Sequence, residues 1–323
     1  MGASPARLVT STSAPSPLGW VYAGMSLQVF ISAGTYLAGK RAMTELPPLT
    51  VVLWRFLLSG SVFVLLLLLT PGPALPPRNE WRRVLVLGFL AGPVNQVFFF
   101  QGLSRSTAAH AALLYALTPL GVYLLSLAQG RERASVRALV GIFTAFAGVV
   151  VLLLGRGLAD ASGSLLGDLL ILGAVAAWVL YTTEGKSFVA VHGPIRATAW
   201  SMVASTLMML VFAPFVAMPR EVLAASTLAQ GSIAYLGLMT SVVAYLIWYY
   251  ALSKVPASKV AIFSNLQPAA TALAAWLLLN EPLHWQMAVG GVLVIVGVRL
   301  TQTAPLRTTP PEPAPPGTER RAA

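Results

Sequence analysis

Long apolar stretches separated by short polar connections make up most of the 323-residue chain. A bilayer core about 30 Å thick is crossed by about 20 apolar residues of α-helix. Ten stretches meet or approach that length, and we expect each to be a transmembrane helix. They cover approximately residues 18–39, 48–70, 81–103, 108–129, 136–155, 167–184, 198–215, 230–252, 258–279 and 285–300. The pattern therefore predicts an all-α membrane protein with ten transmembrane helices.

The composition agrees with lipid as the solvent for most of the chain. Hydrophobic residues make up 57% and charged residues 10%, whereas about a quarter of the residues of soluble proteins are charged. A net charge of +11 would suggest nucleic-acid binding in a soluble protein, but here the basic residues flank the apolar stretches. We therefore expect the lipid bilayer, and no nucleic acid, as a partner. A simple membrane anchor would need only one or two such helices.

The basic residues also predict the orientation of the chain. If the N-terminus lies in the cytoplasm, 15 of the 21 Lys and Arg residues lie on the cytoplasmic side, as the positive-inside rule favours. We expect a multi-pass protein of the cell (inner) membrane with both termini cytoplasmic. Residues 1–17 and the Pro-rich residues 303–323 cannot bury a core and are expected to be disordered. Residues 1–17 lack the basic region followed by an apolar region that a signal peptide needs, so the first helix is expected to direct insertion.

The two halves of the chain are similar in sequence. Residues 103–119 (LSRSTAAHAALLYALTP) align without a gap on residues 252–268 (LSKVPASKVAIFSNLQP) after a shift of 149 positions. The same shift pairs glycines in the last helix of each half, Gly141 with Gly290 and Gly148 with Gly297. The predicted organisation is a first five-helix repeat at 18–155, a linker at 156–166 and a second five-helix repeat at 167–302.

An odd number of helices in each repeat forces the second copy to enter the membrane upside down. This inverted arrangement is found in many secondary transporters. The connection after the fourth helix carries Arg131 and Arg133 and is expected inside, whereas its repeat mate at 280–284 has no Lys or Arg. The charges therefore fit two inverted five-helix repeats.

Short motifs in both halves resemble the EamA-type branch of the drug/metabolite transporter superfamily. They are Asn95-Gln96, residues 111–119 (AALLYALTP) and Gly130-Arg131-Glu132 in the first half, and residues 244–252 (AYLIWYYAL), 265–268 (NLQP) and Asn280-Glu281 in the second. The resemblance extends over roughly residues 20–300. It implies ten helices in two repeats and alternating access around a central cavity lined mainly by helices 1, 3, 4, 6, 8 and 9. It implies no particular substrate, because members of that superfamily move chemically diverse small metabolites.

A stripe of polar residues along the first helix is a candidate wall for this cavity. Gln28, Ser32 and Thr35 recur at helical spacing, and Trp178 and Tyr181 form the corresponding stripe on the sixth helix. Polar groups that face lipid are costly, so these residues should face the protein interior. Small and hydroxyl residues can also serve as packing seams between membrane helices. Gln28, Trp178 and Tyr181 are too large for that role and favour the cavity.

Prolines within three of the predicted helices mark further candidates, because a proline bends a helix and frees a backbone carbonyl. The polar residues beside them are Asn95 and Gln96 on the third helix, Tyr115 on the fourth and Asn265 on the ninth. Tyr245 and Trp248 of the eighth helix are expected to extend an aromatic wall. Kinks can alternatively serve helix packing alone.

Charged residues within the helices have two interpretations each. Arg55 lies about seven residues into the second helix, where it would either anchor an anionic substrate group or tie the structure to carbonyls or headgroups. His110 and Lys259 are repeat mates about one turn or less inside their helices. Lys259 is expected to reach toward the interface, and if both residues faced the cavity they would form basic gates at opposite ends. Glu281 and its mate Glu132 are expected to cap helix N-termini.

All ten acidic residues are expected in tails, loops or helix ends, which disfavours a carboxylate proton relay. His110 is retained as a titrating alternative. The absence of cysteine excludes thiolate metal sites, and no Gly-rich phosphate-binding loop is present. No cofactor or metal is therefore expected.

The leading hypothesis is a secondary transporter for small polar or amphipathic metabolites such as amino-acid-like compounds, and an exporter by analogy with the resembled superfamily. The partner would be a small-molecule substrate, and the protein would not be an enzyme. A channel-like facilitator is the first alternative. An intramembrane lipid-modifying enzyme is the second, and three scattered histidines without a buried carboxylate disfavour it. The sequence predicts neither the substrate nor the oligomeric state.

Overall fold

The structure is a computed structural model that describes residues 17–129, 135–154, 161–216, 219–281 and 284–302. These ranges are helical and contain no strand. The α-helices are α1 (Pro17–Ala42), α2 (Pro48–Leu69), α3 (Trp81–Phe89), α4 (Asn95–Leu103), α5 (Ala108–Tyr115), α6 (Thr118–Ala128), α7 (Val136–Leu154), α8 (Ala161–His192), α9 (Pro194–Met209), α10 (Pro219–Ala224), α11 (Thr227–Tyr235), α12 (Ala244–Lys254), α13 (Ala257–Ala261), α14 (Gln267–Leu279) and α15 (Trp285–Gln302). The predicted disordered residues 1–16 and 303–323, Glu132, and 156–160 of the predicted linker lie outside the described residues.

Seven of the described helical stretches are long and apolar enough to cross a membrane. They are Pro48–Leu69, Arg78–Leu103, Ala108–Ala128, Leu165–His192, Pro194–Phe215, Thr227–Lys254 and Lys259–Leu279. Two apolar helices are shorter, at Val136–Gly148 and Trp285–Thr301. The 26-residue helix α1 is not among the seven. The described helices thus agree with a multi-pass membrane protein, and they provide seven candidate spans where the sequence predicted ten.

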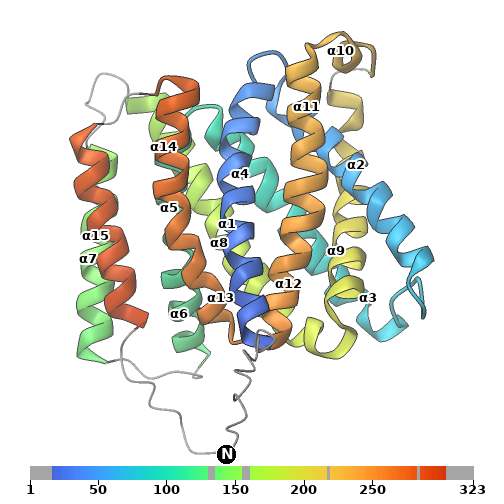
Figure 1. The fold of residues 1–323 in the computed structure, drawn as a ribbon, viewed down its shortest axis with the longest axis horizontal. Coiled ribbons are helices and arrows are strands. Elements are labelled where there is room, and N and C mark those ends of the chain that lie inside the picture. The colour runs from blue at the N-terminus through green and yellow to red at the C-terminus, as the bar shows by residue number, and fades with distance from the viewer. Residues whose placement is uncertain (1–16, 130–134, 155–160, 217–218, 282–283, 303–323) are drawn as a thin grey trace, which may run out of the picture.

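Successive long helical stretches run in alternating directions through the molecule (Figure 1). The short connections between these stretches favour this arrangement, because they leave no room for a parallel return. Helix α8 departs most from the prediction, since it begins at Ala161 and ends at His192 rather than covering residues 167–184. Asp168 therefore lies about two turns inside a helix, where it is 1% exposed, and not at a helix end as predicted.

Polar and apolar side chains are distributed as expected for a protein dissolved in lipid. Large apolar side chains such as Phe30, Leu68 and Phe143 are about 70% exposed on the outside of the bundle. Gln28, Arg55 and many hydroxyl residues are buried. A water-soluble protein places these classes the other way round, whereas lipid requires polar groups to find partners inside the protein.

Four helical stretches are interrupted near their middle. A π-helical segment η2 (Leu90–Val94) separates α3 from α4, and another, η5 (Leu236–Val243), separates α11 from α12. The helix is interrupted between α5 and α6, just before Pro119. In the second half a 3₁₀ segment, η6 (Ile262–Leu266), precedes α14. A shift of 149 residues places each first-half interruption on its second-half counterpart. π and 3₁₀ segments inside helices often mark functional sites.

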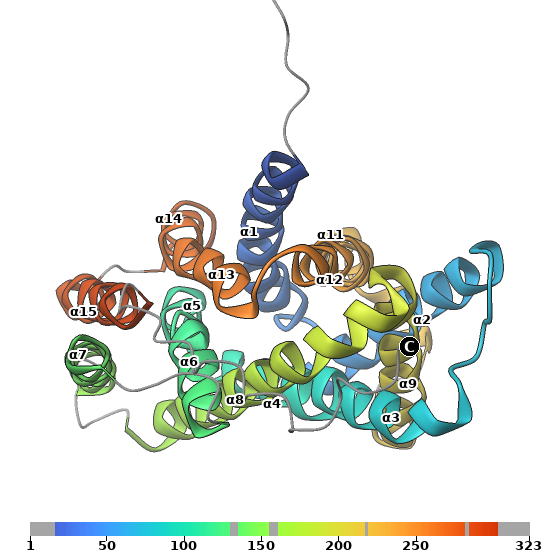
Figure 2. The same cartoon turned by 90° about the horizontal axis from the view of Figure 1, so that it is seen from below.

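Helices α7 and α15 pack side by side at one end of the molecule (Figure 2). Their backbones approach closely because glycines line the contact: a Cβ atom on Gly148 would lie 2.7 Å from the Gly290 carbonyl oxygen. A Cβ atom on Gly141 would likewise overlap the Gly297 backbone. Gly148 thus meets the repeat mate of Gly141, and Gly141 meets the repeat mate of Gly148. A two-fold axis relating the two halves requires this reciprocal pattern. These glycines form the packing faces that let the two helices approach.

Two carboxylates bind helix N-termini. Glu281 accepts hydrogen bonds from the amides of Ala108 (3.0 Å) and Ala109 (3.4 Å) at the start of α5. The predicted capping role is confirmed, although the capped helix comes from the other half of the chain. Glu45 accepts from the hydroxyl (2.6 Å) and the amide (2.8 Å) of Ser226, the N-cap of α11. These hydrogen bonds lower the pKa of Glu45.

Replacing Gly148 with Ala should separate α7 from α15, because the added methyl group meets backbone atoms that cannot turn away. We expect overpacking to cost about 1–3 kcal/mol, seen as a lower unfolding temperature of the purified protein in detergent. Gly231→Ala is the matched control, since a Cβ atom there meets nothing within 4 Å. An equal unfolding temperature in the two variants would contradict this description of the contact.

Candidate functional site

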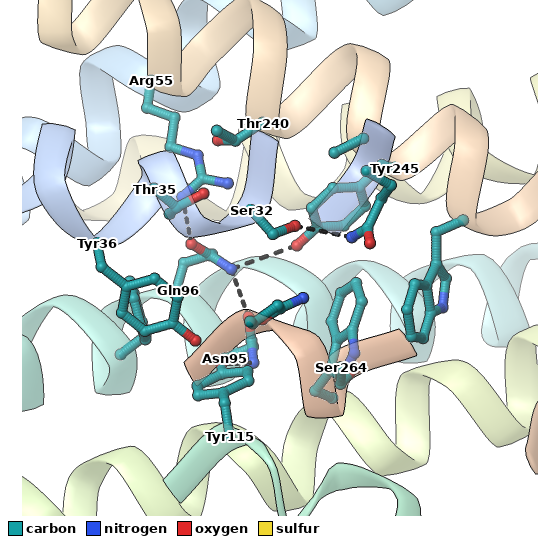
Figure 3. Close-up of a pocket in the computed structure, with 16 residues that line it drawn as sticks. Ser32, Thr35, Tyr36, Arg55, Asn95, Gln96, Tyr115, Thr240, Tyr245 and Ser264 are labelled. Atoms are coloured by element: carbon teal, nitrogen blue, oxygen red, sulfur yellow. Dashed lines mark hydrogen bonds between the residues drawn. The ribbon is translucent and has the colours of Figure 1, made fainter. Parts of the chain in front are cut away.

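A cavity of about 70 Å³ lies in the middle of the bundle, where the interrupted helices meet (Figure 3). Its wall is formed by Gln28, Ser32, Thr35, Tyr36, Arg55, Asn95, Gln96, Phe99, Tyr115, Trp178, Thr240, Ala244, Tyr245, Trp248, Ser264 and Gln267. These residues come from both halves of the chain, and most of their side chains can form hydrogen bonds or present an aromatic face. The cavity is therefore a polar site in the interior of an apolar bundle.

Ten of the fourteen residues predicted for the site line this cavity. They are Gln28, Ser32, Thr35, Arg55, Asn95, Gln96, Tyr115, Trp178, Tyr245 and Trp248. The remaining four, which are Tyr181, His110, Lys259 and Asn265, lie elsewhere in this conformation.

Tyr181 and His110 are buried but turned to other partners. Tyr181 is fully buried behind Trp178, with ring centroids 5.4 Å apart, and its hydroxyl lies 3.2 Å from the hydroxyl of Ser201. The His110 Nε2 atom lies 3.3 Å from a carboxylate oxygen of Asp168 on α8, and both side chains are at most 3% exposed. His110 thus has an acidic neighbour rather than the open position of a basic gate.

Lys259 is exposed, in agreement with its predicted reach toward the interface. Asn265 is buried, and neither of its amide atoms has a hydrogen-bond partner among the described residues. Ser264 and Gln267 line the cavity in its place. The reason is the 3₁₀ segment η6, in which residues three apart share one face, so that the face predicted from α-helical spacing is rotated.

Six further residues of the wall were not predicted from the sequence: Tyr36, Phe99, Thr240, Ala244, Ser264 and Gln267. Two of them could have been predicted from the sequence. Tyr36 continues the helical spacing of Gln28 and Ser32, and Phe99 is the repeat mate of Trp248. Thr240 lies in the π-helical segment η5, whose position α-helical spacing does not predict.

A hydrogen-bonded network runs along one side of the cavity. Arg55 donates from Nε to the Ser241 hydroxyl (2.6 Å) and from Nη1 to the Gln96 amide oxygen (2.5 Å). The Gln96 nitrogen donates to the Asn95 amide oxygen and to the Tyr245 hydroxyl (3.3 Å). Asn95 in turn donates to the Tyr115 hydroxyl (2.8 Å) and to the Ala174 carbonyl (2.7 Å). The network joins α2, α4, α5, α8, η5 and α12.

Aromatic rings form the rest of the wall. The Trp178 ring lies 5.2 Å from the rings of Tyr245 and Trp248, measured between centroids. Phe99 packs edge-on against Tyr36 and Tyr115 on the other side, at 5.3 and 5.4 Å. Rings in these tilted and edge-on arrangements attract one another and give a stiff apolar surface. The cavity can therefore contact both polar and apolar parts of a small molecule.

Two polar atoms of the wall have no hydrogen-bond partner among the described residues. They are the amide oxygen of Gln28 and the indole nitrogen of Trp248. The Gln28 nitrogen donates to the Ser32 hydroxyl at 2.7 Å. Buried polar atoms without partners are costly, so these two atoms are available to a ligand or to water.

A second and larger cavity, of about 550 Å³, lies between α2, α3 and α9. Its wall consists almost wholly of apolar side chains such as Leu68, Leu85 and Val211, which are themselves exposed on the outside of the bundle. A site that recognises a polar solute needs convergent polar groups. We therefore take the central cavity as the candidate functional site. Within the described residues, no group of three or more His, Asp or Glu side chains could hold a metal ion.

Comparison with known proteins identifies the family. The sequence profile described as the EamA-like transporter family matches residues 19–154 and 165–303. The chain belongs to the EamA-like transporter family. An uncharacterised transporter of Archaeoglobus fulgidus is 31% identical to it over 279 residues, 86% of this chain and 95% of that protein. The uncharacterised transporter YyaM of Bacillus subtilis is 29% identical over 290 residues, 88% of this chain and 93% of that protein.

The fold of this EamA-family transporter also matches a solved structure. One crystal structure of a protein superposes with a TM-score of 0.64 at 18% identity, and the match covers 87% of this chain and 98% of the other. Family membership and the apolar helices together confirm the resemblance noted from the sequence motifs: the chain is a multi-pass membrane protein of a transporter family.

The contact between His110 and Asp168 should be measurable as a coupling energy. Removing one member of a buried pair leaves the other without its partner, so His110→Phe and Asp168→Leu should each destabilise the protein. The double variant should be less destabilised than the sum of the two, with a coupling of about 1–3 kcal/mol. Equilibrium unfolding in mixed micelles gives the double-mutant cycle. Purely additive effects would show that the two side chains do not interact.

Proposed function

We propose that this protein is a secondary transporter that moves small polar or amphipathic metabolites, with amino-acid-like compounds as the leading class, by alternating access to the central cavity. The main observation that supports the proposal is the position of the cavity. It lies where helices from both halves of the chain are interrupted, and substrate sites of secondary transporters are formed at such repeat interfaces by discontinuous helices. The direction is taken as export by analogy with the superfamily.

Burial of the polar wall favours a carrier over a channel. Gln28, Arg55, Asn95 and Gln96 line the cavity and are each at most 6% exposed, so these polar groups have little contact with bulk water in this conformation. A cavity of about 70 Å³ has room for several waters, since about 10–15 Å³ of such volume holds one. A metabolite larger than this enters only if one end of the bundle opens, and alternating access provides such an opening.

The proposed architecture comprises ten membrane-spanning helices in two inverted repeats. It adds α1, α7 and α15 to the seven long apolar stretches. Support comes from the reciprocal glycine contacts between α7 and α15 and from the interruptions 149 residues apart. In an inverted repeat the two halves can exchange conformations, which makes the cavity accessible first from one side and then from the other.

Binding to the central cavity is tested by a thermal-shift screen of the purified protein against a metabolite library, because a ligand that binds only the folded state raises the unfolding temperature. We expect hits that Gln28→Ala and Trp178→Ala each weaken about tenfold, through loss of an amide contact and of an aromatic face. Trp276→Ala is the matched control, because Trp276 is half exposed on the outside of α14 and absent from the cavity wall.

Three results would count against this assignment. Hits that Trp276→Ala weakens as much as Trp178→Ala would place binding outside the cavity. Passage of a hit through reconstituted liposomes without saturation would favour the channel-like facilitator. Chemical conversion of an added lipid would favour an intramembrane enzyme.

We also propose that the protein lies in the cell (inner) membrane with both termini in the cytoplasm, where the positive-inside rule places most of its basic residues. Helix α1 begins and α15 ends at the same end of the bundle (Figure 1), as an even number of crossings requires. A reporter enzyme that functions only in the cytoplasm should be active when it is fused after Ala323. Activity of a reporter that functions only outside the cytoplasm would contradict this orientation.

A further inference from the structure

We propose that the central cavity is an anion site in which Arg55 binds a compact oxyanion group of the transported solute, foremost a carboxylate. The inference rests on the proposed transporter function, since it names the chemistry of the substrate that the same cavity would take. It follows from the charge of the site, from the direction of its hydrogen bonds and from its size.

Arg55 carries a charge that no acidic side chain of the described residues balances. Arg55 is 2% exposed, and its hydrogen-bond partners among those residues are Ser241 and Gln96, both neutral. The ring of Phe100, whose centroid lies 5.7 Å from Cζ, also faces the guanidinium but carries no charge. None of the described residues that line the cavity is acidic. A buried charge is costly unless an opposite charge compensates it. An anionic ligand would supply that compensation, whereas a cation would add to the cost.

The guanidinium also sets the direction of the whole network, because arginine can only donate hydrogen bonds. The oxygen of the Gln96 amide must face Arg55, so its nitrogen must face Asn95 and Tyr245. The Asn95 oxygen accepts from Gln96, and the Asn95 nitrogen therefore faces Tyr115. Both tyrosine hydroxyls are thus acceptors within the network, and each keeps its own hydrogen for another partner.

Donors consequently predominate in the cavity. A guanidinium has five N–H groups, and Ser241 and Gln96 accept from only two of the three Arg55 nitrogens, Nε and Nη1. The hydroxyl hydrogens of Tyr115 and Tyr245 and the unpartnered indole N–H of Trp248 add further donors. The unpartnered amide oxygen of Gln28 does not offset them, since the Ser32 hydroxyl can donate or accept and the amide can turn over. Ionised carboxylate and phosphate oxygens act as hydrogen-bond acceptors and not as donors, so they match this array of donors.

The size of the cavity admits the charged end of a solute in this conformation. A volume of about 70 Å³ accepts a carboxylate or a group of similar size. We therefore assign the charged end of the solute to the space beside Arg55. The remainder would contact the aromatic wall of Trp178 and Trp248 once the bundle opens.

The test measures binding of small probes to the purified full-length protein at constant ionic strength. Formate and acetate are the carboxylates, formamide and acetamide their neutral analogues, methylammonium the cation, and inorganic phosphate the alternative oxyanion. We expect formate or acetate to raise the unfolding temperature of the wild type in a saturable manner and the neutral and cationic probes to leave it unchanged. Phosphate binding more tightly than formate would support the oxyanion site and assign it to a phosphoryl group.

Substitution of Arg55 tests whether the oxyanion binds at this residue. Arg55→Gln should weaken formate binding at least tenfold, as expected for loss of a charge-assisted hydrogen bond, and Arg55→Lys should bind with intermediate affinity. Equal oxyanion affinity in wild type and Arg55→Gln would overturn the proposal. So would a wild type that no oxyanion stabilises, or one that formamide or methylammonium stabilises as strongly as formate.

A second pair of variants keeps the proposal testable if Arg55→Gln does not fold. Tyr245→Phe removes one of the predicted donors, and Tyr250→Phe removes a hydroxyl from the 39% exposed side chain five residues away on α12. We expect Tyr245→Phe to weaken formate binding about three- to tenfold and Tyr250→Phe to leave it unchanged. Equal affinity of the two variants for formate would overturn the donor array.

Failure of the anion site can be distinguished from failure of the transporter function. Saturable uptake of a neutral or cationic solute by liposomes containing the protein, without oxyanion binding, would overturn the anion site and leave the transporter standing. Arg55-dependent oxyanion binding together with solute flux that never saturates would retain the anion site and overturn the transporter.

Discussion

A guanidinium that can only donate hydrogen bonds lies in the middle of the bundle, and the side chains around it are oriented by that fact. Arg55 bonds to η5 through Ser241 and to α4 through Gln96. From there the network reaches α5, α8 and α12. The network lies away from bulk water, where a buried polar group without a partner is costly, so each of these groups depends on its neighbours for its hydrogen bonds. The same contacts tie the two halves of the chain together and determine the chemistry of the cavity between them.

Irregular helix geometry is what brings these polar groups to one point. A continuous α-helix presents a given face only every third or fourth residue, and the π-helical segments η2 and η5 shift that face where α4 and α12 approach the cavity. The 3₁₀ segment η6 does the same for Ser264 and Gln267. Because equivalent interruptions occur in both halves, the cavity is formed by matching parts of each, and the glycine contact between α7 and α15 repeats this relation at the edge of the bundle.

Much of the fold could be predicted from the sequence because lipid simplifies the pattern. Apolar length alone located the helices, and the stretch at 48–70 differs from α2 by a single residue. Wall residues that keep α-helical spacing, such as Gln28 and Ser32, were also predictable. Asn265 was predicted for the wall and lies elsewhere, because the position of a 3₁₀ segment depends on contacts between helices that the sequence does not display. The acidic partner of His110 was missed for a similar reason: α8 extends beyond its apolar segment, so Asp168 lies inside a helix and not at its end.

The measurement that tests the central claim most directly is the accessibility of the cavity from each side of the membrane. The chain contains no cysteine, so a single Ser264→Cys substitution reports on the cavity wall, and Leu277→Cys reports on the lipid-facing side of α14. A small impermeant thiol reagent should modify Ser264→Cys from either side of sealed vesicles without crossing into the lumen, and should leave Leu277→Cys unmodified. Modification from one side only, or passage of the reagent through the protein, would contradict alternating access to this cavity.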